Sequence, residues 1–249
     1  MKKSVLMTHL VAGFPDMESS YTVAKAMIDG GASYLEVQFP FSDPSADGPT
    51  IQKACSDALE AGFTLEKGFA LVKRIKEYSD IPVFIMNYGN VPFFFGIEAF
   101  IKRCLDEGVS GLIIPDMIIG RDDGLYDTAA AMGMPVLPVI VPTVSSERLA
   151  QFIELAPPYL YIAMRTGITG KETQISTELL AFLDSFKGTT IKTLAGFGVR
   201  QRSQVEALEA HVHGIIVGSA LVNEITAHID AEEDALYNAV KSKVAGLVG

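Results

Sequence analysis

Two carboxylates close together in the sequence could carry acid–base chemistry. Residues 34–39 alternate in polarity, which places Tyr34, Glu36 and Gln38 on one face of a strand and apolar side chains on the other. Because the apolar face must pack against helices, we expect Glu36 to point into the interior of the sheet, where loss of water suits a carboxylate to proton transfer near neutral pH. A structural ion pair is the competing interpretation, but no Arg or Lys is predicted at the same level of a neighbouring strand.

Asp47 lies in the loop that follows this strand, and prolines at positions 40, 44 and 49 restrict the path of that loop. Carboxylates in loops most often form turns, so Asp47 alone would mean little. Beside Glu36 it suggests two carboxylates in different environments, an arrangement that commonly separates an acid from a base.

Glycine-rich runs in the last third of the chain could bind an anion. Each run follows a predicted strand, and they occupy residues 165–170, 196–198 and 218–219. Glycine lets backbone amides approach a ligand closely, and the amides of a helix N-terminus attract negative charge. Any one run could be only a tight turn, but three together favour a phosphorylated ligand.

The elements that must position these residues repeat along the chain. Eight β-rich runs are predicted, at residues 5–11, 34–39, 82–86, 111–114, 136–141, 159–163, 193–195 and 214–217. Segments of helical period lie between them, at residues 18–29, 50–61, 65–77, 97–106, 146–155, 177–185 and 203–210. One unit for about 31 residues is the usual size of a βαβ repeat. With no linker-like segment, the sequence predicts one α/β domain over residues 1–249, a (β/α)8 TIM barrel whose active site lies at the carboxyl ends of the strands.

Composition excludes several classes of partner. The 20 Lys and Arg residues against 30 Asp and Glu give a formal net charge of −10, so nucleic acid and anionic membranes are not expected partners. No apolar run is long enough to span a membrane, and the N-terminus does not resemble a signal peptide. Cys55 and Cys104 lie far apart and are expected to be reduced and buried, which fits a cytoplasmic protein.

The residue types also narrow the chemistry. No lysine follows the sixth predicted strand, where a Schiff-base aldolase would carry its nucleophile. The four histidines, His9, His211, His213 and His228, cannot be assigned with carboxylates to a metal cluster, so no metal is expected.

Residues 36–52 closely resemble the signature of the tryptophan synthase alpha subunit family, which is usually Leu-Glu-Leu-Gly-x-Pro-Phe-Ser-Asp-Pro-x-Ala-Asp-Gly-Pro. Residues 165–170, 196–198 and 217–220 match the family in order and at compatible spacing. The resemblance extends from about residue 5 to residue 222, nearly the whole chain.

The resemblance implies a lyase of tryptophan biosynthesis. Such a barrel cleaves indole-3-glycerol phosphate to indole and glyceraldehyde 3-phosphate. It passes the indole to a pyridoxal-phosphate-dependent beta subunit, within an alpha2beta2 heterotetramer. The alpha chain would need no cofactor of its own, because a protonated indole ring supplies the electron sink within the substrate.

The resemblance also implies roles for individual residues. Glu36 would protonate the indole ring carbon that is released, and Asp47 would hold the indole N–H as positive charge develops. The remaining expectations are Tyr161 near the glycerol chain, Tyr88 and Phe197 in the indole pocket, the amides of Gly170, Gly198, Gly218 and Ser219 at the phosphate, and Thr169 for substrate binding and Arg165 for loop closure, both in a mobile loop.

This chain also departs from the family's pattern. The family usually carries a helix before the first strand, which is expected to be missing here. Gln38 stands where glycine is typical, His9 replaces an aromatic or aliphatic residue of the indole pocket, and Asn87 replaces an apolar one. Two alternatives therefore stay open: another phosphosugar isomerase or epimerase, and a weakly active subunit that mainly binds and activates its partner.

Overall fold

The structure, a computed structural model, describes residues 4–164 and 175–249 and contains one parallel sheet. The strands follow the order β5-β4-β3-β2-β1-β9-β8-β7-β6. Their bounds are β1 (Leu6–Val11), β2 (Tyr34–Gln38), β3 (Val83–Met86), β4 (Gly111–Ile113), β5 (Val136–Leu137), β6 (Val139–Ile140), β7 (Tyr159–Ala163), β8 (Lys192–Gly196) and β9 (Gly214–Val217).

Strands β5 and β6, at the two ends of this order, are halves of one predicted strand. Pro138 separates them because a proline has no N–H to donate to the neighbouring strand. Its carbonyl still accepts a hydrogen bond from the Tyr161 amide at 3.0 Å. Since the two ends of the sheet meet at one residue, the sheet closes into the predicted eight-unit barrel. The prediction of one continuous strand over residues 136–141 is therefore wrong in one respect: the structure has two short strands there, separated by Pro138.

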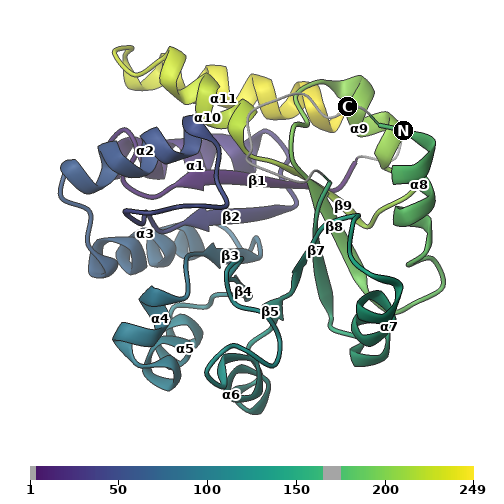
Figure 1. Cartoon of the computed structure of the whole chain (residues 1–249). Helices are drawn as coiled ribbons and strands as arrows, with labels where there is room; N and C mark the ends of the chain where they lie inside the picture. Colours follow the sequence, from purple (N-terminus) through teal and green to yellow (C-terminus); the bar gives the residue numbers. More distant parts are fainter. Residues whose placement is uncertain (1–3, 165–174) are drawn as a thin grey trace.

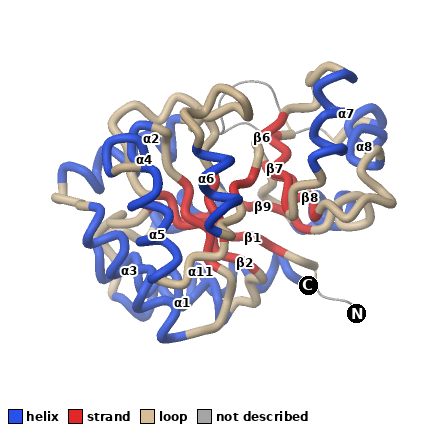
Figure 2. Tube along the Cα trace, turned by 90° about the horizontal axis from the view of Figure 1, so that it is seen from below, coloured by secondary structure: helices blue, strands red, loops and turns tan. Residues whose placement is uncertain are grey.

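Helices surround the barrel on its outer side (Figures 1 and 2). Their bounds are α1 (Met17–Asp29), α2 (Pro49–Glu60), α3 (Leu65–Tyr78), α4 (Asn90–Phe95), α5 (Ile97–Asp106), α6 (Leu125–Met132), α7 (Ser146–Leu155), α8 (Thr177–Asp184), α9 (Arg202–Leu208), α10 (Ser219–Ala227) and α11 (Glu233–Val248). Helices α4, α6, α10 and α11 were not among the predicted segments. Of these, α4 is too short for a helical period to be recognised, and it contains a proline and three consecutive phenylalanines.

Aromatic side chains close the barrel at the amino ends of its strands. The ring of Phe84 lies edge-on to Tyr34 and to Tyr159, with centroids 5.8 and 5.3 Å apart. The Tyr34 hydroxyl is 2.9 Å from Nε2 of His213. Strand β1 begins at Leu6. This cluster therefore fills the base of the barrel beneath the site.

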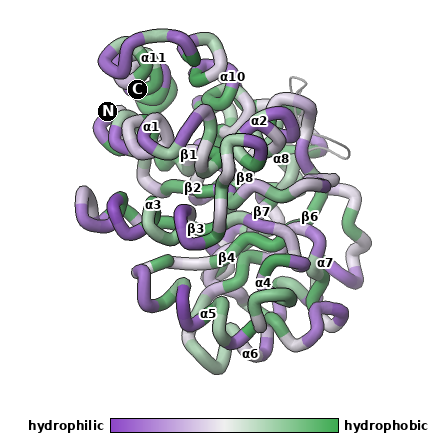
Figure 3. Tube along the Cα trace, turned by 90° about the vertical axis from the view of Figure 1, so that its left-hand side faces the viewer, coloured by the Kyte–Doolittle hydropathy of each residue, from purple (hydrophilic) through white to green (hydrophobic). Residues whose placement is uncertain are grey.

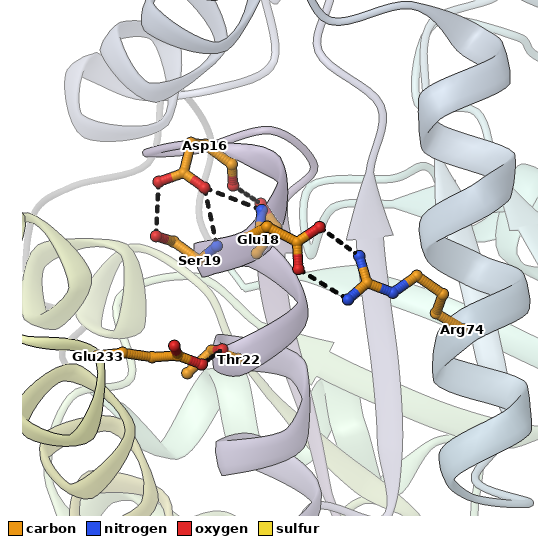
Figure 4. A network of polar contacts seen from close by, with 7 residues as sticks. Asp16, Glu18, Ser19, Thr22, Arg74 and Glu233 are labelled. Atoms are coloured by element: carbon orange, nitrogen blue, oxygen red, sulfur yellow. Dashed lines mark hydrogen bonds and ion pairs between the residues drawn. The ribbon is translucent and has the colours of Figure 1, made fainter.

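Helix α1 is tied to the helices on both sides of it (Figure 4). Asp16 caps its N-terminus by accepting hydrogen bonds from two backbone amides of the first turn, which contributes about 1 kcal/mol. Arg74 of α3 donates to both carboxylate oxygens of Glu18, at 2.7 and 2.8 Å. On the other side, Thr22 donates to Glu233 of α11. The Arg74–Glu18 pair is exposed and adds little stability, so the cap and the buried faces hold α1 in place.

Two glycine-to-alanine changes should alter stability in opposite directions. In α3, a Cβ on Gly68 would lie 2.8 Å from the rings of both Phe39 and Phe63, so Gly68→Ala should lower the free energy of unfolding by about 1–3 kcal/mol. In α11, Gly246 is exposed with nothing within 4 Å, so Gly246→Ala should raise it by up to about 1 kcal/mol. Urea unfolding measures both changes, and shifts of the same sign would contradict this account of the packing.

Candidate active site

A cavity of about 260 Å³ opens at the carboxyl ends of the strands. Its lining contains most of the predicted site residues that the structure describes, namely Glu36, Asp47, Tyr161, Phe197, Gly198, Gly218 and Ser219. The predicted site residues Arg165, Thr169 and Gly170 lie outside the described residues. The site is therefore built from β2 and its loop on one side and from the last three strands on the other.

Glu36 points into the barrel from β2 and is 3% exposed. The parallel register pairs His9 of β1 with Glu36, and His9 Nδ1 lies 3.1 Å from Glu36 Oε1. Only Arg and Lys were expected as possible partners of Glu36, and this histidine was not predicted. Its signal was available, because a residue of β1 with the same inward orientation can face Glu36 directly.

The charge of His9 depends on its neighbours. Burial lowers the pKa of His9, but the Glu36 carboxylate, through its charge and its hydrogen bond, and the charge of Asp47 raise it, so the net pKa lies above the usual 6.5. His9 Nε2 and Glu36 Oε2 are buried without a hydrogen-bond partner among the described residues. Both groups therefore keep one polar atom available to a ligand in the cavity.

Asp47 lies at the end of the loop before α2 and is 5% exposed. One of its oxygens, Oδ2, accepts hydrogen bonds from Gln38 Nε2 at 2.8 Å and from the Tyr88 hydroxyl at 2.9 Å. The Tyr88 hydroxyl in turn accepts from the Ala46 amide at 3.0 Å. Burial raises the pKa of Asp47, while the hydrogen bonds and the charge of His9 lower it, and the net direction is upward.

Gln38 and Tyr88 thus support Asp47. Gln38 shares the inner face of β2 with Glu36, but its amide donates to Asp47. Tyr88 is buried behind Asp47 and is not among the residues that line the cavity, so its contact with the indole ring stays a prediction. Asn87 does not line the cavity either, and the nitrogen and oxygen of its buried side-chain amide have no hydrogen-bond partner among the described residues.

Apolar side chains form most of the cavity wall, and they come from α2, from several strands and from the residue after β6: Ile51, Met86, Ile113, Val139, Val141 and Ile216. Tyr161 adds a phenol whose pKa is raised well above its usual value, first by burial and then by the charges of Glu36 and Asp47. It is therefore a neutral hydrogen-bond donor at all ordinary pH values. Such a wall suits a flat aromatic group with a few polar atoms.

Phe197 reaches the cavity through an unusual backbone. Its φ of 93° lies in the left-handed region, which a bulky residue rarely adopts, and Gly198 follows with φ 77°. Strain of this kind persists where surrounding structure over-determines it, and it concentrates at ligand sites.

Another part of the cavity lining is suited to binding an anion. Helix α10 begins at Ser219 with Gly218 as its N-cap, and both line the cavity with Gly198. The first amides of a helix have no partner within the helix, and the helix dipole places partial positive charge there. These three predicted residues are therefore brought together where a phosphate could bind.

The described residues show neither a metal-binding cluster nor a membrane-spanning helix. No group of three or more His, Cys, Asp or Glu side chains in this part of the chain is arranged to hold a metal ion. Among its helices, none combines the length and apolar content needed to cross a membrane.

Comparison with known proteins identifies the family. The family model described as tryptophan synthase alpha chain matches residues 1–246. The chain belongs to this family. The tryptophan synthase alpha chain of Helicobacter hepaticus is 38% identical over 231 residues, which cover 90% of this chain and 86% of that one. The alpha chain of Methanoregula boonei is 37% identical over 250 residues, which cover 98% and 94%.

Solved structures of the tryptophan synthase family share the fold. A chain of the tryptophan synthase complex from Pyrococcus furiosus superposes with a TM-score of 0.87 at 28% identity, covering 100% of this chain and 99% of that one. A chain of Mycobacterium tuberculosis tryptophan synthase gives 0.86 at 29% identity, covering 99% and 93%. The resemblance inferred from residues 36–52 and the TIM-barrel fold are thereby confirmed.

The raised pKa of Asp47 predicts a pH-dependent difference in stability between the wild type and Asp47→Asn. The native protein binds this proton more tightly than the unfolded chain does. The stability it contributes is therefore present below the unfolded-state pKa, near 3.8, and is lost as the pH rises through the folded-state value. Relative to Asp47→Asn, the free energy of unfolding of the wild type should fall as the pH rises from about 4 towards neutrality. Urea unfolding across this range tests the sign, and a wild-type advantage that grows with pH would contradict it.

Proposed function

We propose that this chain cleaves indole-3-glycerol phosphate to indole and glyceraldehyde 3-phosphate. The observation that carries the proposal is that two buried carboxylates and the N-terminus of α10 line the same cavity in a member of this family. The apolar side chains of the cavity wall fit an indole ring, and the amides of Gly198, Gly218 and Ser219 fit the phosphate of the substrate. An isomerase or epimerase is not favoured, because the family is that of the alpha chain.

The reaction needs a proton to move twice. Glu36 donates a proton to the ring carbon that carries the glycerol chain, which turns the ring into an electron sink. Asp47 holds the ring N–H as positive charge develops. When the carbon–carbon bond breaks, the adjacent hydroxyl becomes an aldehyde and loses its proton, and the Glu36 carboxylate left by the first step can accept it. The proton balance therefore closes on one residue.

Tyr161 and the phosphate end orient the substrate. A phenol that stays neutral can donate a hydrogen bond to the glycerol chain without competing for the proton. Because the phosphate is fixed at α10, the ring carbon is directed towards Glu36, which replaces a bimolecular encounter by a fixed geometry.

A beta chain is the proposed partner, and α4 provides part of the proposed surface. Phe94 is 95% exposed, Phe93 and Ile118 are also exposed, and Met117 packs against Gly89 at the start of α4. The trace around α4 is markedly hydrophobic in Figure 3. Helix α4 follows the carboxyl end of β3, and residues 117–118 follow the carboxyl end of β4. Both therefore lie on the same side of the barrel as the cavity, so a chain docked there could receive indole directly.

The proposal assigns no cofactor to this chain, and pyridoxal phosphate is expected only in the beta chain. Residues 1–249 are proposed to act as one domain. A cytoplasmic location is supported by the biosynthetic role and by the buried free thiols of Cys55 and Cys104.

Glu36→Gln tests the acid assignment. Without a transferable proton, turnover should fall at least about 100-fold, whereas binding of inorganic phosphate should change less than about twofold because the α10 amides are untouched. Indole release, measured with the isolated chain and with a beta chain, gives turnover, and calorimetry gives phosphate binding. More than a few per cent of wild-type turnover would refute the role of Glu36, and indole from neither wild-type preparation would refute the lyase.

Phe94→Glu tests the partner surface. Placing a charge on the most exposed phenylalanine of α4 should weaken beta-chain binding at least about tenfold and leave indole release by the isolated chain unchanged. Leu155→Glu is the matched control, because Leu155 is 58% exposed but ends α7 at the opposite end of the barrel. Equal effects of both changes on binding would remove α4 from the interface.

A further inference from the structure

His9 has no role in the mechanism above, although it is 2% exposed and lines the same cavity as Glu36. His9 lies opposite Glu36 in the pairing of β1 with β2, and its Nδ1 is 3.1 Å from Glu36 Oε1. Burying an imidazole costs free energy unless its polar atoms find partners. Here one nitrogen has a partner, and Nε2 has none among the described residues.

The contact with His9 makes the two carboxylate oxygens of Glu36 different from each other. Oε1 is occupied by His9, and Oε2 has no hydrogen-bond partner among the described residues. A carboxyl group that is free to rotate would offer either oxygen to a ligand in varying orientations. With Oε1 held, a single oxygen is left for proton transfer.

From this geometry we propose that His9 is a positioning residue for Glu36, donating its Nδ1–H to Oε1 so that Oε2 delivers and recovers the proton. The proposal rests on the proposed cleavage. In the first step Oε2–H loses its proton to the ring carbon, and the negative charge that forms on Glu36 is stabilised by the His9 N–H. In the second step Oε2 takes the proton of the hydroxyl, and the pair returns to its starting state with no net gain or loss.

The surroundings of His9 support this arrangement. The described titratable side chains that line the cavity with it are Glu36 from β2, Asp47 from the following loop and Tyr161 from β7. Burial lowers the pKa of His9, but the charges of Glu36 and Asp47 raise it. A negative charge on Glu36 and an N–H on His9 Nδ1 therefore stabilise each other. The faces of α2 and α10 towards the cavity add only uncharged groups, Ile51, Gly218 and Ser219.

Two substitutions of similar size separate positioning from a merely structural role. In His9→Asn, an amide N–H stands close to the place of Nδ1–H, whereas His9→Leu removes the donor. We expect His9→Leu to lower kcat for indole release by about 10- to 100-fold with KM changed less than about twofold. His9→Asn should recover most of the loss. Equal losses in both variants, or full kcat in His9→Leu, would overturn the proposal.

A second measurement needs no activity. The ring resonances of His9, assigned by their loss in His9→Asn, report its titration by NMR. In Glu36→Gln the largest raising influence is gone and burial remains, so the His9 midpoint should fall by about one to three pH units. An unchanged midpoint would overturn the pairing even if the wild type releases indole, whereas a shifted midpoint in a protein that releases none would refute only the proposed function.

Discussion

The parallel register of β1 against β2 is the constraint on which the site depends. It sets His9 opposite Glu36 and Leu10 opposite Val37, so one pair faces the cavity and the next faces the helices. Because side chains alternate along a strand, a shift of one residue would turn the inner set outward and bury charge against the apolar layer. The hydrophobic pattern that specifies the barrel therefore also specifies the acid–base pair.

The two carboxylates differ in the kind of group that holds them. Asp47 accepts hydrogen bonds from two neutral donors, Gln38 and Tyr88, whose own protonation does not change near neutral pH. Glu36 is held by His9, whose protonation can change in that range. A carboxylate fixed by neutral donors suits a steady interaction with a ring N–H, and one beside a titratable base suits a group that gains and loses a proton.

Sequence patterns predicted the features that depend on neighbouring residues along the chain. The alternation over residues 34–39 placed Glu36 inward, and the spacing of eight β-rich runs predicted the barrel. They did not predict what depends on contacts between distant segments. The partner of Glu36 required the register of β1, and the position of Tyr88 behind Asp47 required the path of the chain after β3. The break at Pro138 could have been predicted, because a proline cannot donate to a neighbouring strand and so interrupts an apolar run that otherwise favours one continuous strand.

The net charge of −10 and the proposed phosphate ligand are compatible because the field that matters is local. Helix α10 offers amides to the cavity, and His9 lies between Glu36 and the start of α10: Nδ1 is 3.1 Å from Glu36 Oε1, and a Cβ on Gly218 would lie 3.7 Å from the imidazole Cγ. Two anions in a poorly hydrated cavity repel each other strongly. A donor that gains positive charge beside the Glu36 carboxylate reduces this repulsion while the phosphate is bound. In the proposed reaction, the histidine that orients Glu36 therefore also reduces the repulsion between its carboxylate and the phosphate of the substrate.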